Sequence, residues 1–188
     1  MEKKALKIIA GGSGGQGVLT LGKVLAYAGI NRNLQVSCLP AYGAEMRGGY
    51  AYCTLVFSSG TDLPSPVISR ADIGVFMNDR SFSMLSASLK TGGFSFINAS
   101  LFKNSRDTGF KTFEIPATET AESLGNIQAA NMVMAGALAY VVTKEFFTLD
   151  QRDVRSGIVN TIKDANARKL SEKAVETGWT LAEKLCQT

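Results

Sequence analysis

The spacing of apolar positions changes along the chain, and the change separates predicted strands from predicted helices. Residues 6–10 form a short, largely apolar run with branched side chains, which is typical of a buried strand. From 18 to 28 the apolar residues recur at helical spacing. Further strands are predicted at 34–39, 50–58, 73–77, 94–97 and 111–115. Both faces of 50–58 are largely apolar, so this strand is expected inside a covered sheet.

The second half of the chain is predicted to be mainly helical. Helices are expected over 80–90, from 117 onward, over the strongly apolar segment 131–142, from Asp150, and over about 166–186. Thr118 or Thr120 is expected to cap the helix near 117. Strands alternating with helices predict an α/β fold, with 6–10 and 34–39 joined by a right-handed crossover. We therefore expect one Rossmann-like domain over 1–188, a mostly parallel sheet flanked by helices, with a helical C-terminal part.

Length and composition narrow the class of protein. The chain has 188 residues, 45% of them apolar, which suits one domain with a full core. No segment is long and apolar enough to cross a membrane, and the charged N-terminus does not lead into a signal-peptide core. The net charge of +4 is spread along the chain without a basic, aromatic-rich run. A cytoplasmic protein that binds neither membrane nor nucleic acid is therefore expected.

The chain lacks several residue types on which catalysis often depends. It contains no histidine, which excludes the commonest general base and the usual zinc sites. Its cysteines, Cys38, Cys53 and Cys186, are scattered, so they predict neither a metal site nor a disulfide framework. Cys38 and Cys53 fall in strand patterns and are expected to be inert apolar residues. No catalytic residue and no metal ligand can be named.

The glycine-rich stretch 10–18, AGGSGGQGV, stands between the first strand and the first helix. Gly12, Gly14 and Gly17 satisfy G-x-G-x-x-G, the pattern of dinucleotide-binding turns. That pattern also needs an acidic residue at the end of the second strand, where this chain has the sequence CLPA; the next acid is Glu45. A nicotinamide or flavin site is therefore disfavoured.

Two interpretations of this turn stay open. Backbone N–H groups at a helix start attract anions, so the turn could hold a phosphate or a carboxylate. Alternatively, the glycines serve only to let the helix pack closely on the sheet. Gln16 is informative because a tight turn needs no amide side chain, and this one can reach a neighbouring loop or a ligand.

Three segments together resemble one family. Residues 12–18, GSGGQGV, are similar to its opening G-x-G-G-Q-G-V; residues 41–49, AYGAEMRGG, to its Y-G-P-E-x-R-G-G loop; and residues 126–136, NIQAANMVMAG, to its N-x-x-x-x-N-M-x-x-x-G helix. The chain resembles the gamma subunit of the 2-oxoacid:ferredoxin oxidoreductases over most of its length. Ala44 departs from the pattern, where proline is usual.

The resemblance implies a part in the coenzyme A-dependent oxidative decarboxylation of a 2-oxoacid to acyl-CoA and CO2, with electrons passed to ferredoxin. Thiamine diphosphate, magnesium and iron–sulfur clusters would belong to alpha, beta and delta (ferredoxin-like) subunits, and this chain alone would bind no cofactor and be inert. Its loop is most similar to that of 2-oxoglutarate enzymes. Pyruvate, ketoisovalerate and indolepyruvate enzymes remain alternatives, as does a free nucleotide- or anion-binding Rossmann-like module.

The resemblance and the residue types together give candidate site residues. Arg47 could hold a phosphate or carboxylate while Glu45 orients it, but a salt bridge within or between subunits is the favoured use of the pair. Asn126 and Asn131 are expected to make capping or helix-to-loop hydrogen bonds. The candidate contacts to coenzyme A or to a subunit are Gly12, Gly14, Gly15, Gln16, Gly17 and Arg47. The candidate interface residues are Tyr42, Gly43, Glu45, Arg47, Gly48, Gly49 and Asn131.

Overall fold

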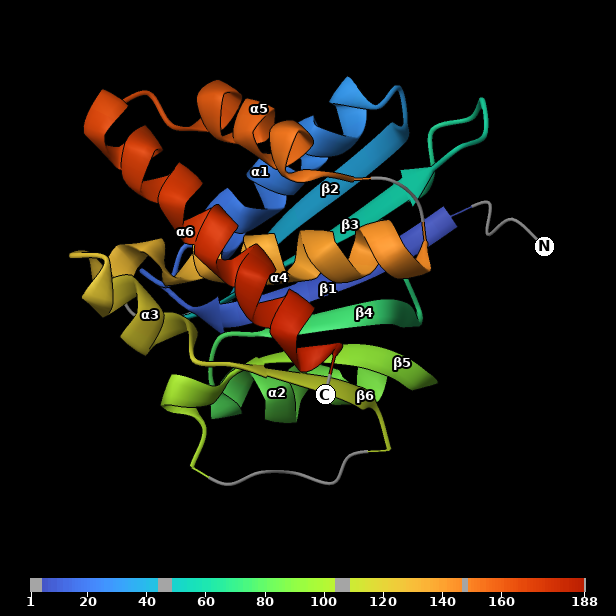
Figure 1. Cartoon of the computed structure of the whole chain (residues 1–188). Coiled ribbons are helices and arrows are strands. Elements are labelled where there is room, and N and C mark those ends of the chain that lie inside the picture. Colours follow the sequence, from blue (N-terminus) through green and yellow to red (C-terminus); the bar gives the residue numbers. More distant parts are fainter. Residues whose placement is uncertain (1–4, 44–48, 104–108, 147–148, 188) are drawn as a thin grey trace.

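A computed structural model describes residues 5–43, 49–103, 109–146 and 149–187 (Figure 1). The strands are β1 (Ala5–Ser13), β2 (Gln35–Tyr42), β3 (Tyr50–Ser58), β4 (Ala71–Phe76), β5 (Leu89–Asn98) and β6 (Lys111–Ile115). The helices are α1 (Val18–Asn31), α2 (Asp79–Leu85), α3 (Ala117–Ser123), α4 (Ala130–Glu145), α5 (Gln151–Thr161) and α6 (Ala165–Leu185). Short 3-10 turns cover Ser86–Ser88, Ala99–Leu101 and Ile127–Ala129.

The strands form one mixed sheet in the order β2-β3-β1-β4-β5-β6. β4 pairs parallel with both β1 and β5, and β5 pairs parallel with β6, whereas β3 pairs antiparallel with β1 and β2. Since β2 is antiparallel to β3, it points the same way as β1. Among the strands that the structure describes, β3 therefore runs against the rest, and the expected mostly parallel α/β sheet is confirmed.

The position of β3 confirms that residues 50–58 lie inside the sheet and adds which strands they separate. β1, α1 and β2 follow one another in sequence as a crossover unit, but β3 returns between the two strands and separates them. Burial explains the order: β3 is buried along almost its whole length, whereas β2 is largely exposed or half-buried. A strand with two apolar faces gains most from a central position, and the more polar strand is left at the edge.

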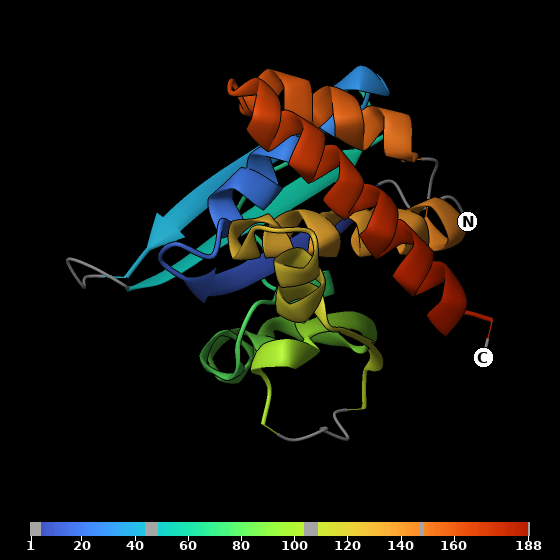
Figure 2. The ribbon, with the colours of Figure 1, turned by 60° about the vertical axis from the view of Figure 1, so that its left-hand side comes forward.

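The two faces of the sheet are covered unequally. α1, α4, α5 and α6 lie on one side and α2 on the other, as Figures 1 and 2 show. The larger core cluster lies on the first side and joins Leu6, Ile8 and Phe57 of the sheet to α1 and α4. A smaller cluster on the second side is built around Phe76 and Phe82.

α4 is the central helix of the larger layer. The predicted apolar segment 131–142 lies inside it, and every residue from Ala130 to Val142 is buried. It packs against the sheet through β5 and against α6 on its outer side. A helix that is apolar all round is expected where both of its sides are covered.

The predicted helix 80–90 is wrong in its second half. α2 ends at Leu85, and β5 already begins at Leu89. Leu89 is buried in the smaller core cluster and pairs with Ala71, while Lys90 forms an ion pair of 2.8 Å with the buried Asp72. Tertiary contacts with β4 therefore override the local helical pattern.

The expected threonine cap of α3 is also wrong. Pro116 occupies the N-cap position and makes no side-chain cap. Thr118 lies inside the helix, where its N–H donates to Asn98 Oδ1 at 3.2 Å and its hydroxyl accepts from Asn98 Nδ2 at 2.8 Å. The side chain of Asn98 at the end of β5 thus accepts a hydrogen bond from an N–H group in the first turn of α3. A local sequence pattern cannot reveal such a partner. The predicted start of a helix at Asp150 is confirmed, with Asp150 as its N-cap, and so is the capping hydrogen bond of Asn126.

Candidate functional site

The glycine turn leads from the carboxyl end of β1 into α1. Gly14 and Gly15 are exposed at its bend, and Gly15 has a φ of 93°. Gly17 occupies the N-cap position with a φ of 69°, and no side chain caps the helix there. The N–H groups of the first helical turn lie next to exposed backbone, the arrangement that favours anions.

Gln16 fastens this turn to the neighbouring strand. Its Oε1 accepts from the Ser13 N–H at 2.7 Å and from Asn78 Nδ2 at 2.6 Å. Its Nε2 donates to the Met77 carbonyl oxygen at 3.3 Å. The expectation that the amide reaches a neighbouring loop is confirmed, and Gln16 holds the ends of β1 and β4 at a fixed separation.

Close packing accounts for two of the glycines. A Cβ at Gly12 would lie 2.8 Å from Val18 Cγ2 and 2.9 Å from Gln16 Oε1. A Cβ at Gly17 would collide with the amide of Asn131, whose Nδ2 donates to the Gly17 carbonyl oxygen at 2.9 Å. A Cβ at Gly15 would meet nothing within 4 Å. Gly15 is therefore an open position, while Gly12 and Gly17 serve packing.

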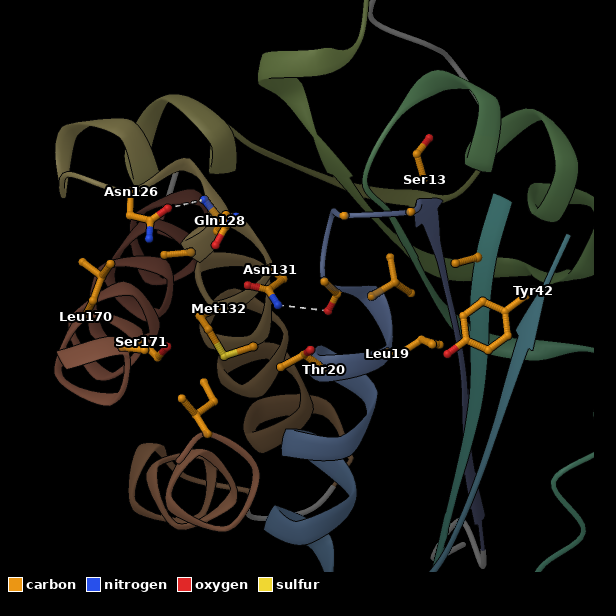
Figure 3. A pocket seen from close by; sticks show the side chains of 18 residues that line it. Ser13, Leu19, Thr20, Tyr42, Asn126, Gln128, Asn131, Met132, Leu170 and Ser171 are labelled. Atoms are coloured by element: carbon orange, nitrogen blue, oxygen red, sulfur yellow. Dashed lines mark hydrogen bonds between the residues drawn. The ribbon is translucent and has the colours of Figure 1, made fainter. Parts of the chain in front are cut away.

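A cavity of about 450 Å³ surrounds the start of α1. Figure 3 shows Asn131 and Met132 of α4 on one side of it and Leu19 and Thr20 of α1 on the other. The described residues that line it include no charged side chain; the polar ones are Ser13, Thr20, Tyr42, Asn126, Gln128, Asn131 and Ser171. A smaller, more apolar cavity of about 170 Å³ lies against Gly15 and Gln16 and is lined by Met77, Leu101 and Ile127.

The larger cavity lies where the connections that follow two adjacent parallel strands, β1 and β4, turn to opposite faces of the sheet. α1 follows β1 onto one face of the sheet, while α2 follows the adjacent parallel strand β4 onto the other (Figure 2). Such a divergence leaves a crevice at the carboxyl ends of the two strands, which is where open α/β sheets bind ligands. Backbone N–H groups and neutral polar side chains can bind and orient an anionic ligand there. Among the described lining residues, the phenol of Tyr42 is the only ionisable side chain.

The other candidate residues fall into three groups. Tyr42 is 72% exposed and lines the larger cavity from the end of β2. The backbones of Gly43 and Gly49 are held in place, since the Gly43 N–H donates to the Tyr50 carbonyl oxygen and the Gly14 N–H to that of Gly49. Glu45, Arg47 and Gly48, together with Ala44, lie outside the described residues.

Two asparagines and a serine that shape the site were not identified as such from the sequence. Asn78 stands two residues after β4 and Asn98 is the last residue of β5, and their side chains bind the ends of three strands and α3 together. A polar residue at the end of an apolar strand run is a pattern visible in the sequence, and it could have indicated both asparagines. Ser171 comes from α6 and lies about forty residues along the chain from Asn131 and Met132 of α4. Only the fold therefore brings it to the cavity beside them.

Metal ligands and cysteine thiols are the other groups of the chain that could carry chemistry. The described residues contain no group of histidine, cysteine or acidic side chains that could hold a metal ion. Burial raises the pKa of the Cys53 thiol, and burial likewise raises the pKa of Cys38, which agrees with inert apolar roles. No helix in the described part of the chain has the length and apolar character needed to span a membrane.

Comparison with known proteins gives a consistent result. The model of the pyruvate ferredoxin/flavodoxin oxidoreductase family matches residues 7–183. The ketoisovalerate oxidoreductase subunit VorA of Methanothermobacter marburgensis is 32% identical over 137 residues, which are 73% of this chain and 28% of VorA. The 2-oxoglutarate synthase subunit KorC of Archaeoglobus fulgidus is 29% identical over 136 residues, which are 72% of this chain and 70% of KorC.

A solved structure has the same fold. The 2-oxoglutarate:ferredoxin oxidoreductase of Magnetococcus marinus, with 2-oxoglutarate, coenzyme A and succinyl-CoA bound, superposes with a TM-score of 0.85 at 24% identity. The match covers 97% of this chain and 32% of that one. This chain therefore spans about a third or less of the length of both VorA and the Magnetococcus chain, and more than two thirds of KorC.

Proposed function

The chain belongs to the pyruvate ferredoxin/flavodoxin oxidoreductase family, and we propose that it is the gamma component of a multisubunit 2-oxoacid:ferredoxin oxidoreductase. In this role it binds coenzyme A at the glycine turn and presents it to partner subunits. The overall reaction is the oxidative decarboxylation of a 2-oxoacid to acyl-CoA and CO2, with electrons passed to ferredoxin.

One observation carries the proposal: the 450 Å³ cavity at the start of α1, beside the exposed Gly14 and Gly15. A helix start provides N–H donors and a positive dipole end, which suit the diphosphate of coenzyme A. The neutral lining suits an uncharged pantetheine arm, which offers amides for hydrogen bonds. Coenzyme A is also present in the Magnetococcus enzyme that shares this fold.

We propose that the subunits divide the reaction between them. In this proposal the cavity of this chain positions coenzyme A, and its described lining residues take no part in breaking bonds. Decarboxylation and electron transfer then fall to the alpha, beta and ferredoxin-like delta subunits, which supply thiamine diphosphate, magnesium and iron–sulfur clusters. The exposed Tyr42 and the segment from Gly43 to Gly49 form the proposed contact with them.

We propose 2-oxoglutarate as the substrate. The loop at 41–49 supports it, as does the similarity to KorC over most of that protein's length. The similarity to VorA keeps ketoisovalerate as the alternative. Purification of the native complex, followed by comparison of kcat/KM for 2-oxoglutarate, ketoisovalerate, pyruvate and indolepyruvate, decides between them.

The coenzyme A site is tested with a charge placed at the turn. Gly14 does not have a positive φ, so Gly14→Asp adds a carboxylate beside the cavity without backbone strain. In the purified complex we expect this variant to raise the KM for coenzyme A at least about tenfold by charge repulsion, with the KM for the 2-oxoacid unchanged. Gly14→Asn is the matched control because it has the same shape and no charge. Equal KM values for the two variants would contradict the proposed site.

A further inference from the structure

Asn78 connects the glycine turn to the helix on the opposite face of the sheet. It stands between β4 and α2, and its Oδ1 caps α2 by accepting from the Ser81 N–H at 2.8 Å. Its Nδ2 donates to Gln16 Oε1 at 2.6 Å and to Ser13 Oγ at 3.0 Å. One side chain therefore serves two elements, α2 through its oxygen and the glycine turn through its nitrogen.

The orientation of two amide side chains follows from these contacts. Because the cap of α2 needs an acceptor, the Asn78 amide must direct its nitrogen at Gln16. The Gln16 amide must then present Oε1, which also accepts from the Ser13 N–H at 2.7 Å, while its Nε2 donates to the Met77 carbonyl oxygen at 3.3 Å. In the reversed orientation, Nε2 of Gln16 would face two donors and its Oε1 would face a carbonyl oxygen. The cap of α2 thus determines how Gln16 lies in the turn.

Asparagine is the helix-capping residue that can hold both partners. Serine, threonine and aspartate also cap helices well, so the cap alone does not require an amide at position 78. Aspartate, however, carries acceptors only, and serine and threonine offer a single hydroxyl group on a shorter side chain. The bond from Asn78 to Gln16 is therefore a role separate from the cap.

The glycine turn is held from both faces of the sheet. On the side of α4, Asn131 donates to the Gly17 carbonyl oxygen at 2.9 Å. On the side of α2, which Figure 2 shows across the sheet, Asn78 acts through Gln16. Both residues that directly precede α1 are thus fixed by side chains from other elements. Since the N–H groups at the start of a helix have no partner within it, this arrangement fixes the donors that face a ligand.

We propose that Asn78 is a positioning residue for the coenzyme A site: through the Gln16 amide, it fixes the N–H groups at the start of α1 that receive the diphosphate. Asn78 is not among the described residues that line the two cavities, so it acts without touching the ligand. Donors that are ordered in advance bind more tightly, because binding does not have to order them. The inference rests on the proposed function, since it assumes that coenzyme A binds at the turn.

The test separates the bond to Gln16 from the cap of α2. Asn78→Ser keeps a capping hydroxyl and adds no charge, but its side chain is too short to hold the cap and Gln16 together. In the purified complex this variant is expected to raise the KM for coenzyme A about five- to tenfold, with kcat and the KM for the 2-oxoacid unchanged. Gln16→Ala is expected to have the same effect. The double variant is expected to raise the KM no further, because Asn78 acts through Gln16.

Ser81→Ala is the matched control. It removes the other half of the same capping box, in which Ser81 Oγ accepts from the Asn78 N–H at 3.3 Å, and it leaves the bond from Asn78 to Gln16 in place. It is expected to destabilise α2 without changing the KM for coenzyme A. Hydrogen exchange of residues 11–17 gives a second readout that does not depend on the ligand: exchange is expected to be faster in Asn78→Ser and unchanged in Ser81→Ala.

Asn78→Asp is the second variant if Asn78→Ser does not fold, since it keeps the cap and the shape of the side chain but presents an acceptor to Gln16 Oε1. If Gly14→Asp raises the KM for coenzyme A but the Asn78 variant does not, or if its effect adds to that of Gln16→Ala, the positioning role is overturned while the proposed function stands. If neither Gly14→Asp nor the Asn78 variant changes this KM, the proposed function and the positioning role both fail.

Discussion

At the scale of single residues, the site depends on one contact between helices that are far apart in sequence. Asn131 of α4 is only 5% exposed and donates to the carbonyl oxygen of Gly17 at 2.9 Å. This hydrogen bond orients the start of α1, and with it the N–H groups that face the cavity. Gly17 is needed there for two reasons: its φ is positive, and its missing Cβ leaves room for the amide.

Two alanine substitutions separate the effect of the positive φ from the effect of the space that the Asn131 amide needs. Gly15→Ala and Gly17→Ala both force alanine into the left-handed region, at about 1–2 kcal/mol each. Gly17→Ala also displaces the Asn131 amide, so it is expected to lower the free energy of unfolding by about 1–2 kcal/mol more. Urea denaturation measures both values. Equal losses would mean that Asn131 moves aside freely and does not hold the turn.

At the scale of elements, α1 is joined to α5 by an ion-pair cluster. Asp150 caps α5 through the N–H groups of Arg152 and Asp153, and it also forms ion pairs with Arg32 and Arg152. Burial raises the pKa of Asp150, but the hydrogen bonds from the Arg152 side chain and the two N–H groups outweigh it, so the pKa lies below its usual value of 3.8. A carboxyl group with a lowered pKa stabilises the folded state above its unfolded pKa, and that stability is lost as the pH falls through the folded pKa.

Asp150→Asn is therefore expected to reduce the acid sensitivity of the protein. Asparagine keeps the helix cap but cannot ionise, so the variant should be less stable near neutral pH yet lose less stability below about pH 4. The measurement is the free energy of unfolding as a function of pH. Asp164→Asn is the control, since Asp164 caps α6 through Ala167 and forms no ion pair among the described residues. If the free energy of unfolding of Asp150→Asn depended on pH as that of the wild type does, Asp150 would not be a source of the acid sensitivity.

α4 and α6 meet through a reciprocal pair of glycines. A Cβ at Gly178 would collide with the carbonyl oxygen of Val133, and one at Gly136 with that of Val175. Because both obstacles are backbone atoms, a methyl group can be accommodated only by moving the helices apart. The separation would also shift Ser171 and Leu170 of α6 away from the cavity that they line.

Gly178→Ala is expected to lower the free energy of unfolding by about 2 kcal/mol, although alanine is the better helix former by about 1 kcal/mol. Lys173→Ala on the exposed side of the same helix should change it by less than about 0.5 kcal/mol. Chemical denaturation provides both numbers. A stabilised Gly178→Ala protein would show that helix propensity outweighs the close approach.

At the scale of the whole molecule, the two sides of the sheet are protected in different ways. One side has a thick helical layer, whereas over β2 and β3 the other side is crossed by a strap, residues 59–70. Two hydroxyls of the sheet hold the strap: Ser37 Oγ donates to the Pro64 carbonyl oxygen at 2.5 Å, and Thr54 Oγ1 donates to that of Pro66 at 2.7 Å. The prolines suit the strap because each lacks an N–H donor and keeps the chain extended, which disfavours strand pairing with the sheet.

Thr54→Val removes one of these bonds while keeping the shape of the side chain. We expect a loss of about 1 kcal/mol in the free energy of unfolding, and faster hydrogen exchange in the strap than in the wild type. Thr61→Val, at an exposed position in the strap itself, is the control for the substitution type. Unchanged exchange in Thr54→Val would mean that the strap is held by other contacts.

Local patterns predicted the elements that local forces decide. The strand at 111–115 and the start of α5 after Asp150 agree with the structure, because apolar alternation and an N-cap residue act within a few positions. The helix predicted over 80–90 and the cap at Thr118 or Thr120 failed, because Asp72 and Asn98 act on these segments from other strands. At the site, the glycine turn was identified from the sequence, but the roles of its members were not. Gly15 is open to a ligand, and Gly12 and Gly17 face neighbouring side chains.

The sequence by itself determined the class of fold, the order of its elements and the position of the glycine turn, since these follow from periodicity and backbone freedom along the chain. It also carried the family resemblance, through motifs whose order can be read directly. Only the tertiary structure decided that β3 lies between β1 and β2, that Asn131 holds Gly17, and that α4 and α6 close one side of the cavity. Those outcomes depend on which surfaces bury one another, and contacts between residues more than a hundred positions apart leave no period in the sequence.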